Sequence, residues 1–192
     1  MIEEVDLQSD MKVFGFWIYL MTDLIIFAAL FASYIVLQQA TFGGPTAFQL
    51  FEMSKALQET LILLTSSFTC AMGMLAIHKK QKKTALFRFS VTFALGVLFL
   101  ILEISEFIQC IQEGNGPSRS AFLSSFFALV GTHGTHILVG LLWMGVEMVR
   151  ICLRKLSDQN VSRIFRMVIF WHFLDLVWIF IFTTVYGMGH LS

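Results

Sequence analysis

Seven ionisable side chains stand inside long apolar stretches of this sequence, and they are the residues with the most chemical potential. They are Asp23, Glu103, Glu106, His133, His136, His172 and Asp175. A charged carboxylate at the centre of a bilayer costs roughly 2.5 to 3.5 kcal/mol on insertion scales. Each Leu or Phe contributes only about 0.3 to 0.6 kcal/mol in return. If the stretches cross a membrane, we therefore expect these side chains to be paired, neutral or directed toward a wet cavity.

Six of the seven fall into pairs whose members are three residues apart, so that each pair shares a helix face. The pairs are Glu103 with Glu106, His133 with His136, and His172 with Asp175. We estimate the depth of each residue from the helical rise of about 1.5 Å per residue, counted from the basic end of its stretch. Asp23, His172 and Asp175 then lie roughly 12 to 17 Å deep, and Glu103 and His133 lie about 24 Å deep. We predict two polar layers. The first contains Asp23, His172 and Asp175, and the second contains Glu103, Glu106, His133 and His136.

Three roles compete for these residues. They could hydrogen-bond facing helices or lipid headgroups, they could handle protons, or they could ligate a metal or a haem. Haem ligation needs only one or two facing histidines, so the count of five histidines does not exclude it. However, no histidine pair stands in a recognisable metal-site context. The three cysteines, Cys70, Cys110 and Cys152, also lack metal-ligand spacing, and we interpret them as reduced packing residues.

Small residues surround the two neighbouring histidines. Gly131, Gly134 and Gly140 lie in the same stretch as His133 and His136, and Trp143 and Glu147 continue the spacing of three and four residues. Small residues allow the backbones of membrane helices to approach closely. We interpret this face as a helix-contact stripe, with the alternative that a membrane helix merely tolerates these glycines.

Five apolar stretches position all of these residues. The chain of 192 residues is 57% hydrophobic and 14% charged, whereas a soluble domain has about 25% charged residues. A helix needs about 20 apolar residues to cross the hydrocarbon, and the stretches at about 14–38, 59–78, 87–111, 120–149 and 164–189 meet that length. They are continuous and too long for barrel strands. The sequence predicts an all-α membrane protein, a bundle of five transmembrane helices that forms a single membrane domain over residues 1–192.

The basic residues predict the orientation of this bundle. The N-terminal tail and the second and fourth loops, together with the span ends, hold all of the thirteen Lys and Arg residues except Lys55 and Arg119. Basic loops stay in the cytoplasm, so we expect a cytoplasmic N-terminus and an outer C-terminus. The net charge is zero, and nothing suggests a surface for nucleic acid.

Four motifs, in order, resemble those of subunit III of the haem–copper terminal oxidases. They are Phe14–Asp23 (FGFWIYLMTD), Leu102–Phe107 (LEISEF), Gly131–His136 (GTHGTH) and Trp171–Trp178 (WHFLDLVW). The resemblance covers residues from about 12 to 189. Within the family, the chain looks most similar to the cytochrome bo-type ubiquinol oxidase branch. It has five spans where the mitochondrial-type subunit has seven, and the segments 43–46 (GGPT) and 126–134 (FFALVGTHG) resemble the quinol oxidase form.

The resemblance implies a role in a bacterial inner-membrane complex of aerobic respiration that oxidises quinol, reduces oxygen to water and pumps protons. Haem and copper are then expected on subunit I. This chain is expected to carry no cofactor, to assemble with subunits I, II and IV, to hold bound phospholipid and to support proton uptake. Longer relatives hold lipid between their first two helices and the other five. This chain lacks those two helices, so an equivalent cleft would need helices from a partner.

One departure from the family concerns the acid of the first motif. That acid is often Glu and here is Asp23, one methylene shorter, whereas Glu106 matches the Ser-Glu-aromatic pattern. Two alternatives to the quinol oxidase interpretation remain. One is subunit III of a cytochrome c oxidase. The other is a stand-alone small transporter or proton channel with Asp23, His172 and Asp175 as its relay.

Overall fold

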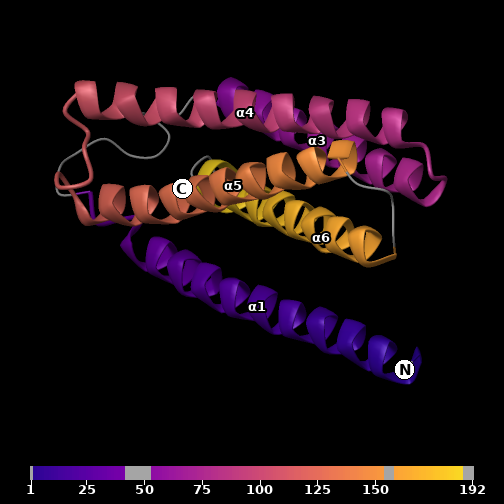
Figure 1. Cartoon of the computed structure of the whole chain (residues 1–192). Helices are drawn as coiled ribbons and strands as arrows, with labels where there is room; N and C mark the ends of the chain where they lie inside the picture. Colours follow the sequence, from indigo (N-terminus) through magenta and orange to yellow (C-terminus); the bar gives the residue numbers. More distant parts are fainter. Residues whose placement is uncertain (1, 42–52, 154–157, 188–192) are drawn as a thin grey trace.

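The computed structural model describes residues 2–41, 53–153 and 158–187, and these residues form five long helices (Figure 1). The helices are α1 (Ile2–Leu37), α3 (Met53–His78), α4 (Lys82–Gln112), α5 (Ala121–Leu153) and α6 (Asp158–Ile181), and α6 continues into a wider π-helical segment, η1 (Phe182–Gly187). No strand occurs in the three described ranges. The prediction of an all-α membrane bundle of five helices is therefore confirmed.

Each helix contains a segment long and apolar enough to cross a membrane. These segments are Val13–Leu37, Met53–His78, Lys82–Gln112, Ala121–Leu153 and Asn160–Val185. Most helices extend past the predicted spans, since a helix can continue into the headgroup region, and the exact limits of the hydrocarbon stay a prediction. Parts of three predictions lie outside the described residues: the 43–46 motif, Arg154 and Lys155 of the basic fourth loop, and the end of the last span at 188–189.

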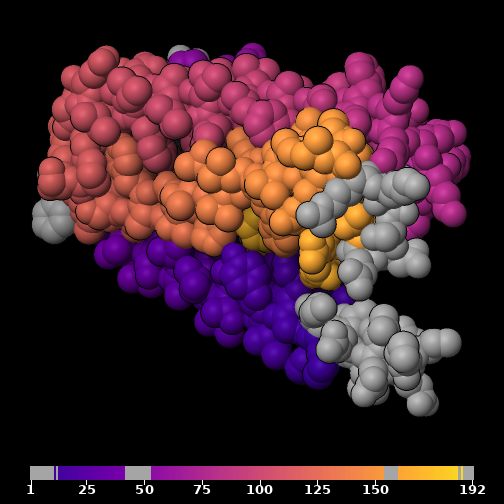
Figure 2. Space-filling view, in the orientation of Figure 1, coloured from indigo at the N-terminus to yellow at the C-terminus, as the bar shows by residue number. Residues whose placement is uncertain are grey.

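The helices are not packed equally. The most extensive contact joins α3 to α4, while α5 contacts α4, α6 and α1, and α6 also packs against α3. Helix α1 lies at one edge, packs mainly against α5 and diverges from the bundle toward its N-terminal end (Figure 1). The space-filling view shows α1 as a separate ridge beneath α5 (Figure 2). One end of the bundle collects the N-terminus, the α3–α4 turn, the end of α5 and the start of α6, so the basic segments gather on one side.

Two tryptophans of α6 tie that helix to α3. Trp171 and Trp178 are both 1% exposed. The Trp171 Nε1–H donates to Ser66 Oγ at 3.1 Å, and the Trp178 Nε1–H donates to Thr60 Oγ1 at 3.1 Å. Lipid is as apolar as a leucine side chain, so membrane helices associate through close packing and interhelical hydrogen bonds of this kind.

Close approach also depends on Gly96 of α4. A Cβ atom at this position would lie 2.6 Å from Cη2 of Trp171 and 2.9 Å from Cδ2 of Leu141. The missing side chain of Gly96 therefore makes the space that the indole ring of α6 fills.

We expect Gly96→Ala to destabilise the bundle by about 1 to 3 kcal/mol, because overpacking shifts Trp171 and Leu141 away from their positions. The measurement is the thermal unfolding midpoint of the detergent-solubilised protein. Gly145→Ala on α5 is the matched control, because its Cβ would meet only Cε2 of Phe93, at 3.8 Å. Equal midpoints for the two variants would contradict the close packing described for Gly96.

Candidate functional site

A polar contact inside the apolar bundle joins α1 to α5. The Asp23 side chain is almost completely buried, and its Oδ1 lies 3.7 Å from Nε2 of His136. Nδ1 of His136 lies 2.8 Å from the Thr132 carbonyl oxygen. Because a carbonyl oxygen can only accept, Nδ1 must carry a proton, and Nε2 is then the nitrogen that faces the carboxyl group.

The position of Asp23 follows from the single buried face of α1. Leu20, Asp23, Phe27 and Tyr34 are each buried, at the three- and four-residue spacing of one helix face. Large apolar side chains such as Ile25 and Val36 occupy the exposed faces. Asp23 is therefore the polar member of an otherwise apolar contact surface, and Phe27 covers His136 with ring centroids 5.2 Å apart.

The Asp23–His136 contact crosses the two predicted polar layers. We predicted Asp23 beside His172 and Asp175, and His136 beside the glutamates. Distances counted along a helix equal depth only when the helices are parallel, and α1 is inclined to α4 and α5 but runs in nearly the same direction as α6 in this view (Figure 1). His172 and Asp175 instead interact with each other on α6. Asp175 is buried, and its Oδ1 has no hydrogen-bond partner among the described residues.

A second polar region gathers acidic side chains of α3 and α4. Glu103 is 2% exposed, and neither carboxyl oxygen has a hydrogen-bond partner in the described part of the chain. Its carboxyl group rests on Gly134 of α5, where a Cβ would lie 2.9 Å from Oε2. Glu59 and Glu106 are close enough to interact electrostatically with Glu103. Glu103 and Glu106 thus interact, as their shared helix face predicts, and Glu59 of α3 joins them.

The sequence analysis missed Glu59 as a member of this region. Glu59 is 3% exposed and lies on α3, six residues after the first residue of that helix, Met53. The predicted second span begins at residue 59, and Glu59 is not among the seven ionisable residues predicted to be functional. Because α3 begins at Met53, Glu59 lies inside the helix and not at its first residue.

His133 is buried among aromatic rings. It is 0% exposed, and neither ring nitrogen has a hydrogen-bond partner among the residues that the structure describes. Its ring lies 5.3 Å from the Trp178 ring and 6.0 Å from the Phe99 ring, measured between centroids. This packing joins α5 to α6 and α4, with the histidine as an aromatic filler of the core.

The predicted contact stripe of α5 faces several helices. Gly131 lies near Phe107 of α4, and a Cβ at Gly140 would lie 3.3 Å from Trp171 and from Phe170 of α6. Trp143 packs against Phe170 with ring centroids 5.8 Å apart. Glu147 is buried at the basic end of the stripe, where the Arg150 Nη1 donates to its Oε1 at 2.7 Å.

These groups can hold protons, accept hydrogen bonds and fix helices against one another. Among the described residues, no group of three or more His, Cys, Asp and Glu side chains is arranged to bind a metal ion.

Comparison with known proteins decides the family. The sequence profile of a family described as cytochrome c oxidase subunit III matches residues 5–190. The chain belongs to the cytochrome c oxidase subunit III family. It is 55% identical over 179 residues to the cytochrome bo(3) ubiquinol oxidase subunit 3 of Pseudomonas aeruginosa, covering 93% of this chain and 86% of the relative.

Two further relatives in this family have names that specify different electron donors, ubiquinol and cytochrome c. The cytochrome bo(3) ubiquinol oxidase subunit 3 of Pseudomonas putida is 48% identical over 95% of this chain and 88% of its own length. The cytochrome c oxidase subunit 3 of Bacillus sp. is 42% identical over the same shares of the two chains. With its five membrane-crossing helices and bacterial relatives, this subunit III is a multi-pass protein of the bacterial inner membrane.

We expect the Asp23–His136 contact to appear as an energetic coupling between α1 and α5. In a double-mutant cycle of Asp23→Ala and His136→Ala, the interaction energy should be about 0.5 to 3 kcal/mol, as found for residues in contact. The measurement is unfolding of the protein in mixed micelles. A cycle of Asp23 with His78, an exposed residue at the end of α3, is the control and should be additive within about 0.5 kcal/mol. Additivity of both cycles would show that the contact does not hold α1.

Proposed function

We propose that this chain is the subunit III of a quinol-oxidising haem–copper terminal oxidase of aerobic respiration. The observation that carries the proposal is the 55% identity to a ubiquinol oxidase subunit 3 across 93% of the chain. The family match over residues 5–190 supports it, because it covers all five helices. The electron donor binds elsewhere in such a complex, so its identity rests on likeness to the relatives.

In this proposal the chain is a non-catalytic subunit. Haem and copper are carried by subunit I, and subunits I, II and IV are the partners in a proton-pumping complex. The large apolar side chains exposed on every helix, such as Phe68 and Leu142, provide surface for lipid and for partner helices. The chain supports assembly, lipid binding and proton uptake by subunit I.

The buried polar side chains act in this role as fixed contacts. Asp23 and His136 hold α1 at its angle to the bundle, and a partner that packs along α1 then meets a defined surface. Buried acids also respond to a neighbouring proton pathway, because they are poorly screened in hydrocarbon. We therefore assign Asp23 a part in the durability of the complex during turnover and not in oxygen reduction.

The second candidate is subunit III of a cytochrome c oxidase, which the 42% identical relative of Bacillus sp. favours. A detergent extract of cells that produce a tagged chain decides between the donors. We expect haem-bearing partners to co-purify, to show a visible haem spectrum, and to consume oxygen with ubiquinol and not with reduced cytochrome c. Activity with cytochrome c alone would establish the second candidate. A chain that purifies alone and conducts protons in vesicles would be a stand-alone channel.

We expect Asp23→Asn to leave the initial rate of oxygen consumption of the assembled complex within about twofold of wild type. A single buried contact supplies only a modest part of the stability of the protein, so the complex still assembles. Activity should then decline faster during turnover, because the contact that holds α1 is weakened. Glu113→Gln, at an exposed acid after α4, is the control and should decay as wild type does. Complete loss of the initial rate in a fully assembled complex would contradict the non-catalytic role.

The cytoplasmic N-terminus is also part of the proposal, and thiol labelling measures it. In a Cys152→Ser background, Lys79→Cys marks the α3–α4 turn and Ser118→Cys marks the turn before α5; both positions are exposed. Because basic loops remain in the cytoplasm, a membrane-impermeant maleimide should label Ser118→Cys in right-side-out vesicles and Lys79→Cys in inverted ones. The reverse pattern would invert the orientation.

A further inference from the structure

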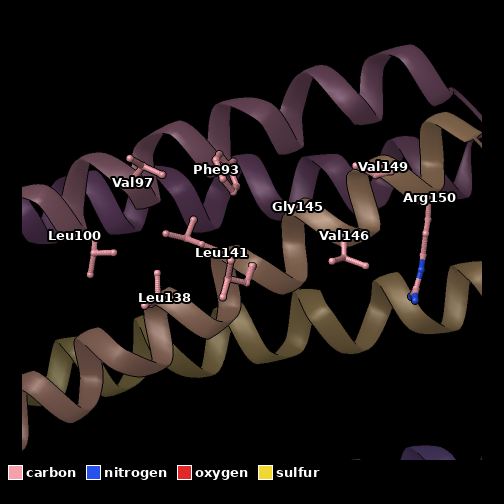
Figure 3. Close-up of a pocket in the computed structure, with 10 residues that line it drawn as sticks. Phe93, Val97, Leu100, Leu138, Leu141, Gly145, Val146, Val149 and Arg150 are labelled. Carbon is pink, nitrogen blue, oxygen red and sulfur yellow. The ribbon is translucent and has the colours of Figure 1, made fainter.

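An apolar groove runs along the outer surface between α4 and α5. Its volume is about 740 Å³. Figure 3 shows the two rows of side chains that form it, one from each helix. The α4 row is Phe93, Val97 and Leu100, and the α5 row is Leu138, Leu141, Leu142, Gly145, Val146, Val149 and Arg150. None of the buried acids and histidines discussed above contributes to it.

The groove has a buried floor and an exposed rim. Leu141 is only 3% exposed and forms the floor, whereas Leu142 is 65% exposed and Val149 is 57% exposed at the rim. Gly145 makes the groove deep, because a Cβ there would meet only Phe93, at 3.8 Å. A single aliphatic chain fits such a channel between two helices better than a second helix does, since a helix is about 10 Å wide.

The length of the groove matches one leaflet of a bilayer. The distance from Leu138 to Val149 along α5 is about 16 Å at a rise of about 1.5 Å per residue. Half of the hydrocarbon core of about 30 Å is about 15 Å. Leu138 lies close to the middle of α5 (Ala121–Leu153), and Val149 lies near its basic end. The groove therefore begins at the membrane surface and ends near the bilayer centre.

A cation stands at the surface end. Arg150 lines the groove, its side chain is 42% exposed, and one of its nitrogens is held by the buried Glu147. In Figure 3 its charged end extends away from the apolar side chains. A guanidinium has five N–H donors, so the bond to Glu147 fixes its direction and leaves other donors for an anion at the headgroup level.

The other end of the groove is bounded by an acid. A smaller cavity of about 200 Å³ continues from the shared residues Leu100 and Leu138 and is lined by Glu103, Gly131 and Gly134. The lining of this smaller cavity includes a carboxyl group and no cation, so it favours neither an apolar chain nor a phosphate group. The distribution of charge thus gives the occupant a direction, with its anionic part at Arg150 and its apolar end near Leu138.

We propose that the α4–α5 groove holds one acyl chain of a glycerophospholipid whose phosphate group binds Arg150. This inference deepens the lipid-binding role in the proposed function and assigns it to one groove within this chain, without any helix from a partner. A transmembrane helix of another subunit is the alternative occupant that the experiment must exclude.

Native mass spectrometry of the complex in mild detergent, with this chain released from it, measures the retained lipid. We expect the wild-type chain to keep one glycerophospholipid. Arg150→Gln should weaken its retention about fivefold, the effect of roughly one basic residue at a membrane surface. Gly145→Leu should abolish it by filling the groove. The matched controls are Arg163→Gln, an exposed arginine near the start of α6, and Gly15→Leu on α1, where a Cβ would meet nothing within 4 Å.

A photoreactive side chain at Val146 tests the occupant even if Gly145→Leu prevents assembly. Val146 is on the rim and 49% exposed, and Phe68 of α3, at 67%, lies outside the groove and serves as the control. When a detergent wash removes loosely bound lipid before irradiation, we expect a lipid adduct at Val146 and none at Phe68. A protein adduct at Val146, or equal lipid retention by Gly145→Leu and Gly15→Leu, would overturn the proposal.

Two separate measurements distinguish a failure of the lipid proposal from a failure of the proposed function. Co-purification of haem with the tagged chain reports on membership of the oxidase. The lipid count and the Val146 adduct are read on the chain itself, with or without its partners.

Discussion

The absence of hydrogen-bonding solvent in the hydrocarbon is the constraint on which this structure depends. Membrane helices therefore associate through close packing and polar contacts between helices, and the contact between Asp23 and His136 is one such contact. Helix α1 packs mainly against α5 and lies apart from α3 and α4 over much of its length. The pair therefore joins a helix at the edge of the bundle to its centre.

The other helices are also joined by polar contacts and close packing, but through different groups. Trp171 and Trp178 donate to hydroxyls of α3, and glycines replace side chains where an indole or a carboxyl group needs the space. The buried acids Glu59 and Glu103 belong to α3 and α4, the most closely packed pair of helices. Polar groups in this chain thus concentrate at helix junctions, while lipid-facing surfaces carry aliphatic and aromatic side chains.

This arrangement suits a subunit that shapes and stabilises its surroundings. Membership of the cytochrome c oxidase subunit III family is shown by the match over residues 5–190, and the buried polar groups join the helices of this subunit to one another. The groove between α4 and α5 leaves a gap between side chains, and the proposed lipid would add a second kind of contact there. Lipid, helix and partner would then form one continuous packed layer.

The sequence alone determined the fold class, because five long apolar runs are stable as helices only in lipid. It also determined the family, because four motifs occur in the order that the family has. It also identified Asp23, Glu103 and His133 as buried, since their cost in hydrocarbon is set by residue type and position. Only the tertiary structure decided the partners. Asp23 meets His136 because α1 packs mainly against α5 and less against α6, the helix that carries His172. Glu59 joins the acids, and His133 has rings for neighbours, because rotation and tilt of whole helices are set by packing between segments far apart in the chain.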